Sequence, residues 1–225
     1  MTASAPGLSL KTALLLVVPP LMWAGNAVVG RLVYPYVPPL TLNFLRWVGA
    51  FLLLLPLAHA LLRANHPVWS HWRRYALLGL LGVGCYNSFQ YLALHTSSPI
   101  NVTLVASSGP VFMLAIGALF FGQRIRTQQL AGAALSILGV LFVLSRGEPS
   151  SLLSVQWVIG DIYVLIATAC WSFYSWLLSQ DKDPPGLRSN WAHFLMAQVM
   201  FGLGWGGLFS GLEWGFTPAH IEWNA

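Results

Sequence analysis

The chain has 225 residues, of which 56% are hydrophobic and 8% are charged, and its formal net charge at pH 7 is +5. Soluble domains carry about 25% charged residues, so this composition excludes an ordinary soluble domain and predicts a membrane protein. The positive charge does not indicate a nucleic-acid-binding protein, because the basic residues fall in short connections between apolar segments rather than in one patch. We therefore expect the lipid bilayer to be a partner of this chain, and no nucleic acid.

Seven apolar segments have the length of a membrane-spanning helix, which needs roughly 20 residues to cross a bilayer core of about 30 Å. In chain order they cover residues 12–33, 40–62, 75–94, 99–121, 128–145, 159–179 and 190–212. The clearest evidence is the stretch Tyr75–Gln123, whose 49 residues contain no Asp, Glu, Lys or Arg. The polar cluster His95–Pro99 divides this stretch into two spans. The sequence thus predicts an all-α polytopic membrane protein, with consecutive helices as neighbours in a helical bundle.

The distribution of Lys and Arg predicts the orientation of the chain. With the N-terminus in the cytoplasm, eight basic residues flank the cytoplasmic side, and only Arg146 lies in an outer loop. The eight are Lys11, Arg63, Arg73, Arg74, Arg124, Arg126, Lys182 and Arg188. Cytoplasmic loops are enriched in Lys and Arg, so we expect a multi-pass protein of the cell membrane (plasma or inner membrane) with a cytoplasmic N-terminus.

The first and sixth segments indicate an internal repeat. Trp23-Ala24-Gly25-Asn26 and Trp171-Ser172-Phe173-Tyr174 lie 148 residues apart by their tryptophans, and each is followed by a short loop and another helix. Because the copies are offset by five helices, an odd number, the second copy would be inverted in the membrane. Inverted repeats are common in secondary transporters, which bind their solutes between the two halves.

Short motifs follow one another in order along the first five segments. They are Pro20–Asn26, Pro38–Thr41, Phe44–Trp47, Tyr91–Leu94, Ser108–Val111, Phe121–Ile125, Gln129–Leu135 and Gly139–Leu141. As an ordered set they resemble the EamA-type members of the drug/metabolite transporter (DMT) superfamily, well over residues 12–146 and loosely over 159–212. One departure is Gln123, because the family usually has a Glu after the glycine that ends the fourth helix.

The resemblance implies a bundle of ten helices in two inverted five-helix repeats, and export or exchange of small metabolites or toxic compounds. We expect residues 12–146 to form the first repeat. Residues 157–225 would begin the second repeat and supply two of its helices, so that seven of the ten helices are present. On this interpretation the chain is a natural truncation or a fragment of a longer protein.

Polar and aromatic residues inside the apolar segments are candidates for a solute path. An amide or guanidinium facing lipid would lack partners at a cost of a few kcal/mol, so these groups should point into the bundle. The candidates are Trp23, Asn26, Asn43, Arg46, Tyr86, Asn87, Gln90, Tyr91, Trp171 and Tyr174. For Trp23, Asn26, Asn87, Gln90 and Tyr174, packing and hydrogen bonding between helices remain the alternative to lining a pocket.

Arg46 is the most informative candidate, because it lies about two turns inside the outer end of its helix. An arginine in the middle of the bilayer costs ~2.5–3.5 kcal/mol on insertion scales. A functional interpretation is that Arg46, together with Asn26, attracts an anionic or zwitterionic solute. The alternatives are that it snorkels to the interface or bonds backbone carbonyls.

Pro20, Gly109 and Pro110 are candidate hinges, because a proline removes a backbone donor and permits a bend. Pro19–Pro20 and Gly109–Pro110 are predicted to interrupt the first and fourth helices, although transmembrane helices also tolerate proline without moving. Gly132-x-x-x-Ser136 and Gly202-x-x-x-Gly206 allow close backbone approach. That contact is expected within the bundle, and a homodimer is a further partner that it would permit.

Several kinds of site are not indicated. No carboxylate lies in the middle of a predicted span, and Asp161 is near the outer start of the sixth. His59 and His193 have no second ligand at helical spacing, so we expect no metal, and we expect no cofactor. No nucleophile–base pair or carboxylate cluster suggests catalytic residues, so we predict that the protein is not an enzyme.

The sequence favours a transporter that moves small organic metabolites or drugs across the cell membrane by alternating access, as an exporter. A membrane-embedded lipid-modifying enzyme and a non-transporting structural membrane subunit are the alternatives. The aligned polar faces disfavour the structural subunit, because a scaffold does not need them.

Overall fold

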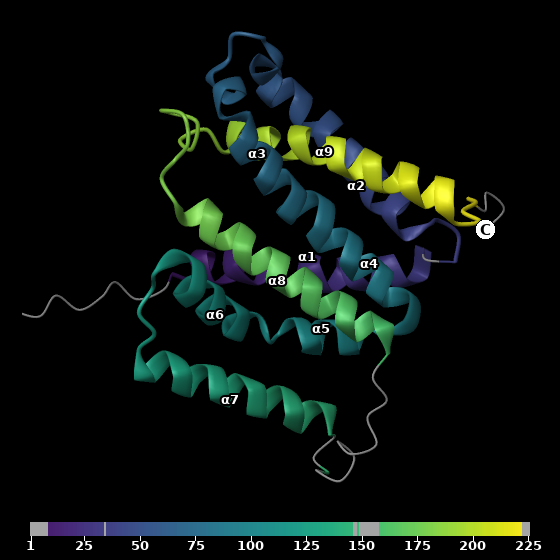
Figure 1. The fold of residues 1–225 in the computed structure, drawn as a ribbon, viewed down its shortest axis with the longest axis vertical. Coiled ribbons are helices and arrows are strands. Elements are labelled where there is room, and N and C mark those ends of the chain that lie inside the picture. The colour runs from purple at the N-terminus through teal and green to yellow at the C-terminus, as the bar shows by residue number, and fades with distance from the viewer. Residues whose placement is uncertain (1–8, 34, 146–147, 149–157, 222–225) are drawn as a thin grey trace, which may run out of the picture.

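The computed structural model describes residues 9–33, 35–145, 148 and 158–221, and the regular structure in these ranges is all helical (Figure 1). The elements are α1 (Leu10–Val33), α2 (Pro39–Ala58), η1 (His59–Leu62), η2 (Pro67–His71), α3 (Trp72–Gly79), η3 (Leu80–Cys85), α4 (Tyr86–Thr96), α5 (Pro99–Ala106), α6 (Gly109–Phe121), α7 (Thr127–Leu144), α8 (Ile159–Ser179) and α9 (Trp191–Phe216). Each of the seven predicted spans is helical, although the fourth is divided into α5 and α6, and this confirms the all-α prediction. Arg146, the predicted outer-loop cation, lies outside the described residues.

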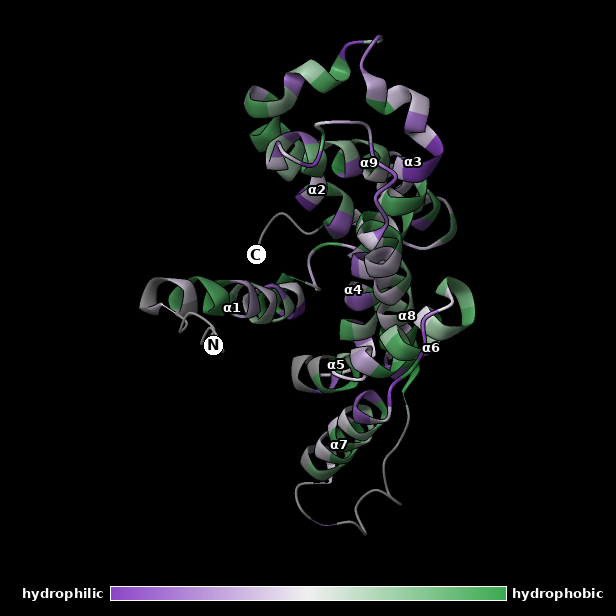
Figure 2. Cartoon of the chain, turned by 90° about the vertical axis from the view of Figure 1, so that its left-hand side faces the viewer, coloured by the Kyte–Doolittle hydropathy of each residue, from purple (hydrophilic) through white to green (hydrophobic). Residues whose placement is uncertain are grey.

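Five of the described helices are long and apolar enough to cross a membrane. They are Leu14–Val33, Pro39–Leu62, Leu104–Phe121, Ile159–Ser179 and Trp191–Phe216, and the shorter Thr127–Phe142 is also apolar. Figure 2 shows hydrophobic residues spread around these helices, while hydrophilic residues gather in the connections near α3. A helix that is apolar on all sides suits a lipid environment, so the chain is a multi-pass membrane protein.

α9 lies at the centre of one half of the bundle, packed against α2, α3 and η3. The core between these elements contains fully buried Leu61, Tyr75, Leu78, Met196 and Val199, among others. Burying large side chains from several helices in one cluster fixes their relative positions, because interiors are closely packed.

Glycines let α9 approach its neighbours closely. A Cβ added at Gly79 would lie 2.6 Å from the backbone nitrogen of Gly202, and a Cβ at Gly202 would lie 2.4 Å from the Val83 Cβ. This contact confirms the close approach predicted for Gly202-x-x-x-Gly206. Gly132 in α7 has no described atom within 4 Å of such a Cβ, so its motif makes no equivalent contact within the described part of the chain.

The third segment is not a uniform α-helix, because Leu80–Cys85 winds as a π-helix between α3 and α4. Its carbonyls find partners in side-chain amides: Asn87 Nδ2 donates to Gly82 O at 3.1 Å, and Asn43 Nδ2 donates to Val83 O at 2.9 Å. Short π-helical turns are frequent at functional sites. Hydrophobic periodicity does not reveal such a turn, since every side chain in this segment is apolar or small.

The proline and glycine positions behave differently in the first and fourth segments. A turn at Ser107–Ser108 separates α5 from α6, and α6 begins directly afterwards with Gly109 and Pro110. Proline suits the first turn of a helix because the missing N–H has no intrahelical partner there. α1, in contrast, continues through Pro19 and Pro20, so the predicted interruption of this helix is not observed. Hinge motion at Pro20, Gly109 and Pro110 stays a prediction.

Candidate solute-binding site

A hydrogen-bonded group joins α1, α2 and α4. Arg46 Nη1 in α2 donates to Asn26 Oδ1 in α1 at 2.7 Å, and Tyr91 Oη in α4 donates to the same oxygen at 2.7 Å. The guanidinium carbon of Arg46 lies 5.4 Å from the centre of the Tyr91 ring and 5.2 Å from that of Trp47. Cation–π contacts of this kind contribute about 0.5–2 kcal/mol. One amide oxygen therefore orients both the cation and the phenol.

Arg46 is only partly satisfied by these contacts. Its Nε is buried and has no hydrogen-bond partner, and among the described residues no carboxylate forms an ion pair with it. A guanidinium has five N–H donors in a planar fork that matches a carboxylate. A buried cation without a counter-charge is costly, so this arrangement favours binding of an anionic group.

A row of aromatic side chains continues from this group toward α8 and α9. Tyr86 lies on α4, as Tyr91 does, and its ring centre lies 4.6 Å from that of Trp171. The Trp171 and Tyr174 ring centres are 5.0 Å apart. Gln90 Nε2 donates to Tyr86 Oη at 3.0 Å, so α4 also supplies a polar group beside the rings.

Glycines place two of these tyrosines. A Cβ at Gly30 would lie 2.7 Å from the Tyr91 ring, and a Cβ at Gly82 would lie 2.8 Å from the Tyr174 ring. Tyr174 Oη donates to Gln198 Oε1 of α9 at 2.6 Å. The rings thus rest on bare backbone at one side and are held by a hydrogen bond at the other, which limits their rotation.

The structure brings together seven of the ten candidates named from the sequence. These are Asn26, Arg46, Tyr86, Gln90, Tyr91, Trp171 and Tyr174. The other three lie elsewhere: Asn43 and Asn87 bind backbone carbonyls of η3, and Trp23 is 65% exposed on α1. A role in transport stays a prediction for all ten.

Sequence reasoning missed Glu213, because the last helix runs to Phe216 instead of ending near residue 212. Glu213 is 7% exposed, and its carboxylate accepts hydrogen bonds from Leu40 N at 3.0 Å, from Thr41 N at 2.8 Å and from Thr41 Oγ1 at 2.8 Å. It therefore caps the N-terminus of α2 from another helix. The signal in the sequence is a single acidic residue beside an apolar segment, together with a helix start at Pro38–Pro39 that has no side chain able to cap it.

The comparisons with known proteins agree with a transporter. Residues 10–145 match the EamA-like transporter family, which confirms the resemblance and shows a transporter family rather than an enzyme. An "Uncharacterized transporter" of Archaeoglobus fulgidus is 29% identical over 76% of this chain and 58% of its own length. The "Uncharacterized inner membrane transporter YedA" of Escherichia coli is 29% identical over 80% of this chain and 57% of its own length.

A third relative carries a more specific name. The "Probable amino-acid metabolite efflux pump" of Salmonella typhimurium is 28% identical over 79% of this chain and 56% of its own length. The chain spans a little more than half the length of these relatives. No solved structure matches the chain.

Proposed function

We propose that this chain, which belongs to the EamA-like transporter family, is an exporter that works by alternating access. Its substrates are small organic solutes with a carboxylate group, which it moves across the cell membrane. The observation that carries the proposal is the partly buried guanidinium of Arg46, which has no carboxylate partner among the described residues and whose Nε is buried without a hydrogen bond. A carboxylate of an anionic or zwitterionic metabolite or drug would supply the missing counter-charge.

The aromatic row supports a solute with an apolar or planar part. Tyr86, Trp171 and Tyr174 offer adjoining ring faces beside the Arg46 group. Ligand sites combine a mostly apolar lining with a few polar groups that fix orientation. The Salmonella relative is named "Probable amino-acid metabolite efflux pump", and a zwitterionic amino-acid metabolite has the carboxylate that this arrangement favours.

The positions of the helices support alternating access between two repeats. The Arg46 group comes from α1, α2 and α4 in residues 12–146, while Trp171 and Tyr174 come from α8 in residues 157–225. Inverted-repeat transporters bind solutes where the repeats meet. Movement of α8 relative to α1 would open the site to one side and then to the other.

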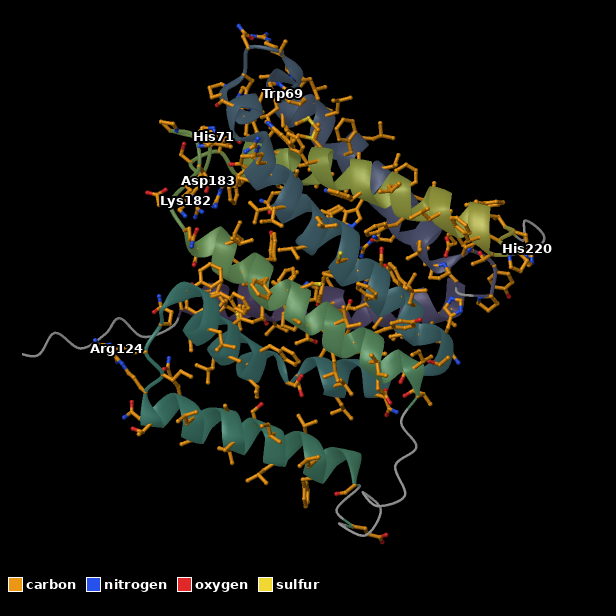
Figure 3. The ribbon with its side chains drawn as sticks, viewed as in Figure 1. Trp69, His71, Arg124, Lys182, Asp183 and His220 are labelled. Carbon is orange, nitrogen blue, oxygen red and sulfur yellow. The ribbon has the colours of Figure 1, made fainter. Side chains whose placement is uncertain are left out.

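The distribution of charge supports a cytoplasmic N-terminus in the cell membrane. Figure 3 places His71, Arg124 and Lys182 at one end of the bundle and His220 at the other. Cytoplasmic loops are enriched in Lys and Arg, and one relative is named as an inner membrane transporter. A homodimer is part of the proposal as well. Its support is the Gly132-x-x-x-Ser136 motif of α7, because a Cβ at Gly132 would have no described atom within 4 Å and a second copy could approach there.

Flux into proteoliposomes that contain the purified protein tests the function. We expect saturable uptake of radiolabelled phenylalanine or a similar zwitterion, and weak uptake of the matching amine without a carboxylate. Arg46→Gln should raise the half-saturating concentration about tenfold or more, since a hydrogen bond to a charged group contributes about 1.5–3 kcal/mol.

Arg31→Gln is the matched control, because it removes the same charge from α1, where the side chain donates to the backbone carbonyl of Leu94. This variant should transport like the unmodified protein. Equal loss in both variants, or equal uptake of the acid and the amine, would contradict the role of Arg46. Absence of saturable flux for a broad panel of metabolites would contradict transport itself.

A further inference from the structure

A basic cleft lies between α3 and the C-terminal end of α8, and it shares no residue with the solute site. It encloses about 410 Å³. His71, Arg73 and Lys182 line its polar part, and Leu77 and Leu177 line its apolar part. Figure 3 shows His71 and Lys182 beside Asp183 at the same end of the bundle. A groove with cations at one end and leucines at the other has the polarity of a lipid molecule.

The floor of the cleft is rigid because Arg74 is bonded on several sides. Its Nη2 donates to Leu177 O at 3.0 Å and to Gln180 O at 2.9 Å, at the end of α8. Its Nε donates to Asp183 Oδ1 at 2.8 Å, and Arg188 Nε donates to Asp183 Oδ2 at 2.6 Å. One aspartate thus joins two arginines across α3 and the α8–α9 connection, and this network links the two sides of the cleft.

The two cations at the rim have no such partners in the part of the chain that the structure describes. Arg73 lies over the Trp72 ring, with its guanidinium carbon 5.6 Å from the ring centre, and Lys182 is exposed. Within the residues that the structure describes, neither one pairs with a carboxylate. Two acids lie nearby: Asp183 is paired with Arg74 and Arg188, and Asp181 is exposed beside Lys182. Together with Arg73 and Lys182 the region has four cations and two acids, so it keeps a positive balance that an anion would neutralise.

The apolar part of the cleft opens toward the side of the bundle. Leu77 is 43% exposed, and Trp72 and Trp69 nearby are 52% and 37% exposed. Tryptophan is enriched at the level of the lipid headgroups. These positions place the cations of the cleft at headgroup level, with the leucines beginning at the depth of the acyl chains.

We propose that this cleft binds one anionic phospholipid, with its phosphodiester between Arg73 and Lys182 and its acyl chains along Leu77 and Leu177. Basic pockets between transmembrane helices on the cytoplasmic side bind such headgroups. A zwitterionic phospholipid is a poorer fit, because its ammonium group would meet the same cations. The lipid would link α3 to α8, which belong to different predicted repeats.

Native mass spectrometry of the purified protein in a delipidating detergent tests the proposal. Phosphatidylglycerol and phosphatidylcholine of equal chain length are titrated separately, and the dissociation constant of the first bound lipid is measured. We expect tighter binding of phosphatidylglycerol. The double variant Arg73→Gln/Lys182→Gln should weaken it roughly 25-fold, since each cation near the membrane surface contributes about fivefold.

Arg124→Gln/Arg126→Gln is the matched control, because it removes two exposed cations from the α6–α7 connection at the same end of the bundle. It should leave binding of phosphatidylglycerol unchanged. Equal weakening in both double variants would overturn the proposal in favour of general surface charge. Equal affinity for the two lipids would overturn it too, as would displacement of the lipid by millimolar inorganic phosphate, which would indicate a site for a soluble anion.

Discussion

Replacing Glu213 tests whether a carboxylate on α9 holds the start of α2 in place. Three donors bind this carboxylate: Leu40 N at 3.0 Å, Thr41 N at 2.8 Å and Thr41 Oγ1 at 2.8 Å. The N-cap residue of α2, Pro38, makes no capping hydrogen bond, and the first turn of α2 contains no acidic residue. Glu213 therefore does alone what a cap and a first-turn acid do together at other helices.

The expected size of the effect follows from those contacts. Glu213→Gln keeps one oxygen acceptor, loses the negative charge at the helix N-terminus, and can no longer accept from all three donors. Hydrogen bonds to charged groups contribute about 1.5–3 kcal/mol, and the helix-dipole interaction up to about 2 kcal/mol in partly buried geometry. We expect a loss of about 2–3 kcal/mol, which lowers Tm by roughly 4–12 °C for a chain of this size.

Thermal unfolding of the purified protein in detergent, followed by tryptophan fluorescence, measures this change. Asp181→Asn is the control, because it removes a carboxylate that is exposed on the α8–α9 connection, and it should leave Tm unchanged. If Glu213→Gln and Asp181→Asn unfold at the same temperature as the unmodified protein, the capping argument is wrong.

Three further predictions use other contacts. Gly202→Ala should destabilise the protein by about 1–3 kcal/mol, because the added Cβ would lie 2.4 Å from a valine side chain of η3; Gly204→Ala, with no described atom within 4 Å, should not. Burial would raise the pKa of the Asp183 carboxyl, but hydrogen bonds from two arginines and a tyrosine outweigh it and hold this pKa below its usual value. The stability that Asp183 contributes should therefore be fully present above the unfolded-state pKa of about 3.9 and lost as the pH falls through the lower pKa of the folded state. Unfolding measured from pH 7 to pH 3 tests this, and Asp183→Asn should remove this pH dependence of stability. Cys85 of η3 and Cys170 of α8 are free thiols on two segments that pack against each other, so copper phenanthroline should join them in a disulfide seen as protection from maleimide; continued labelling of both would refute their proximity.

The helices could be predicted from the sequence because the bilayer imposes a strong constraint. A backbone in lipid must satisfy its own hydrogen bonds, so a long apolar segment has few alternatives to a helix. The stretch Tyr75–Gln123 is the clearest case, since its length and its polar middle determine two spans. The π-helical turn at Leu80–Cys85 escaped prediction, because it depends on the amide of Asn43 in another helix.

The candidate site could be predicted as a set of residues but not as an arrangement. Polar groups in apolar segments must face one another, which is why Asn26, Arg46 and Tyr91 meet. The same rule does not say which group meets which. Asn43 and Asn87 bond to backbone carbonyls of η3, and this depends on the register of that turn. The Trp23 side chain is mostly apolar and has a single N–H donor, so it can face lipid at little cost. It lies exposed on α1.

Arg46 differs from Asp183 and Glu213 in how its charge is compensated. Asp183 is paired with Arg74 and Arg188, and Glu213 receives backbone N–H groups at the start of α2. These two acids therefore need no further partner. Arg46 has one amide oxygen and two aromatic faces, and the described part of the chain offers it no anion. Because a cation in a low-dielectric bundle is stabilised far more by a nearby anion than by neutral groups, the unmet requirement of Arg46 is the physical reason to place a carboxylate-bearing solute there.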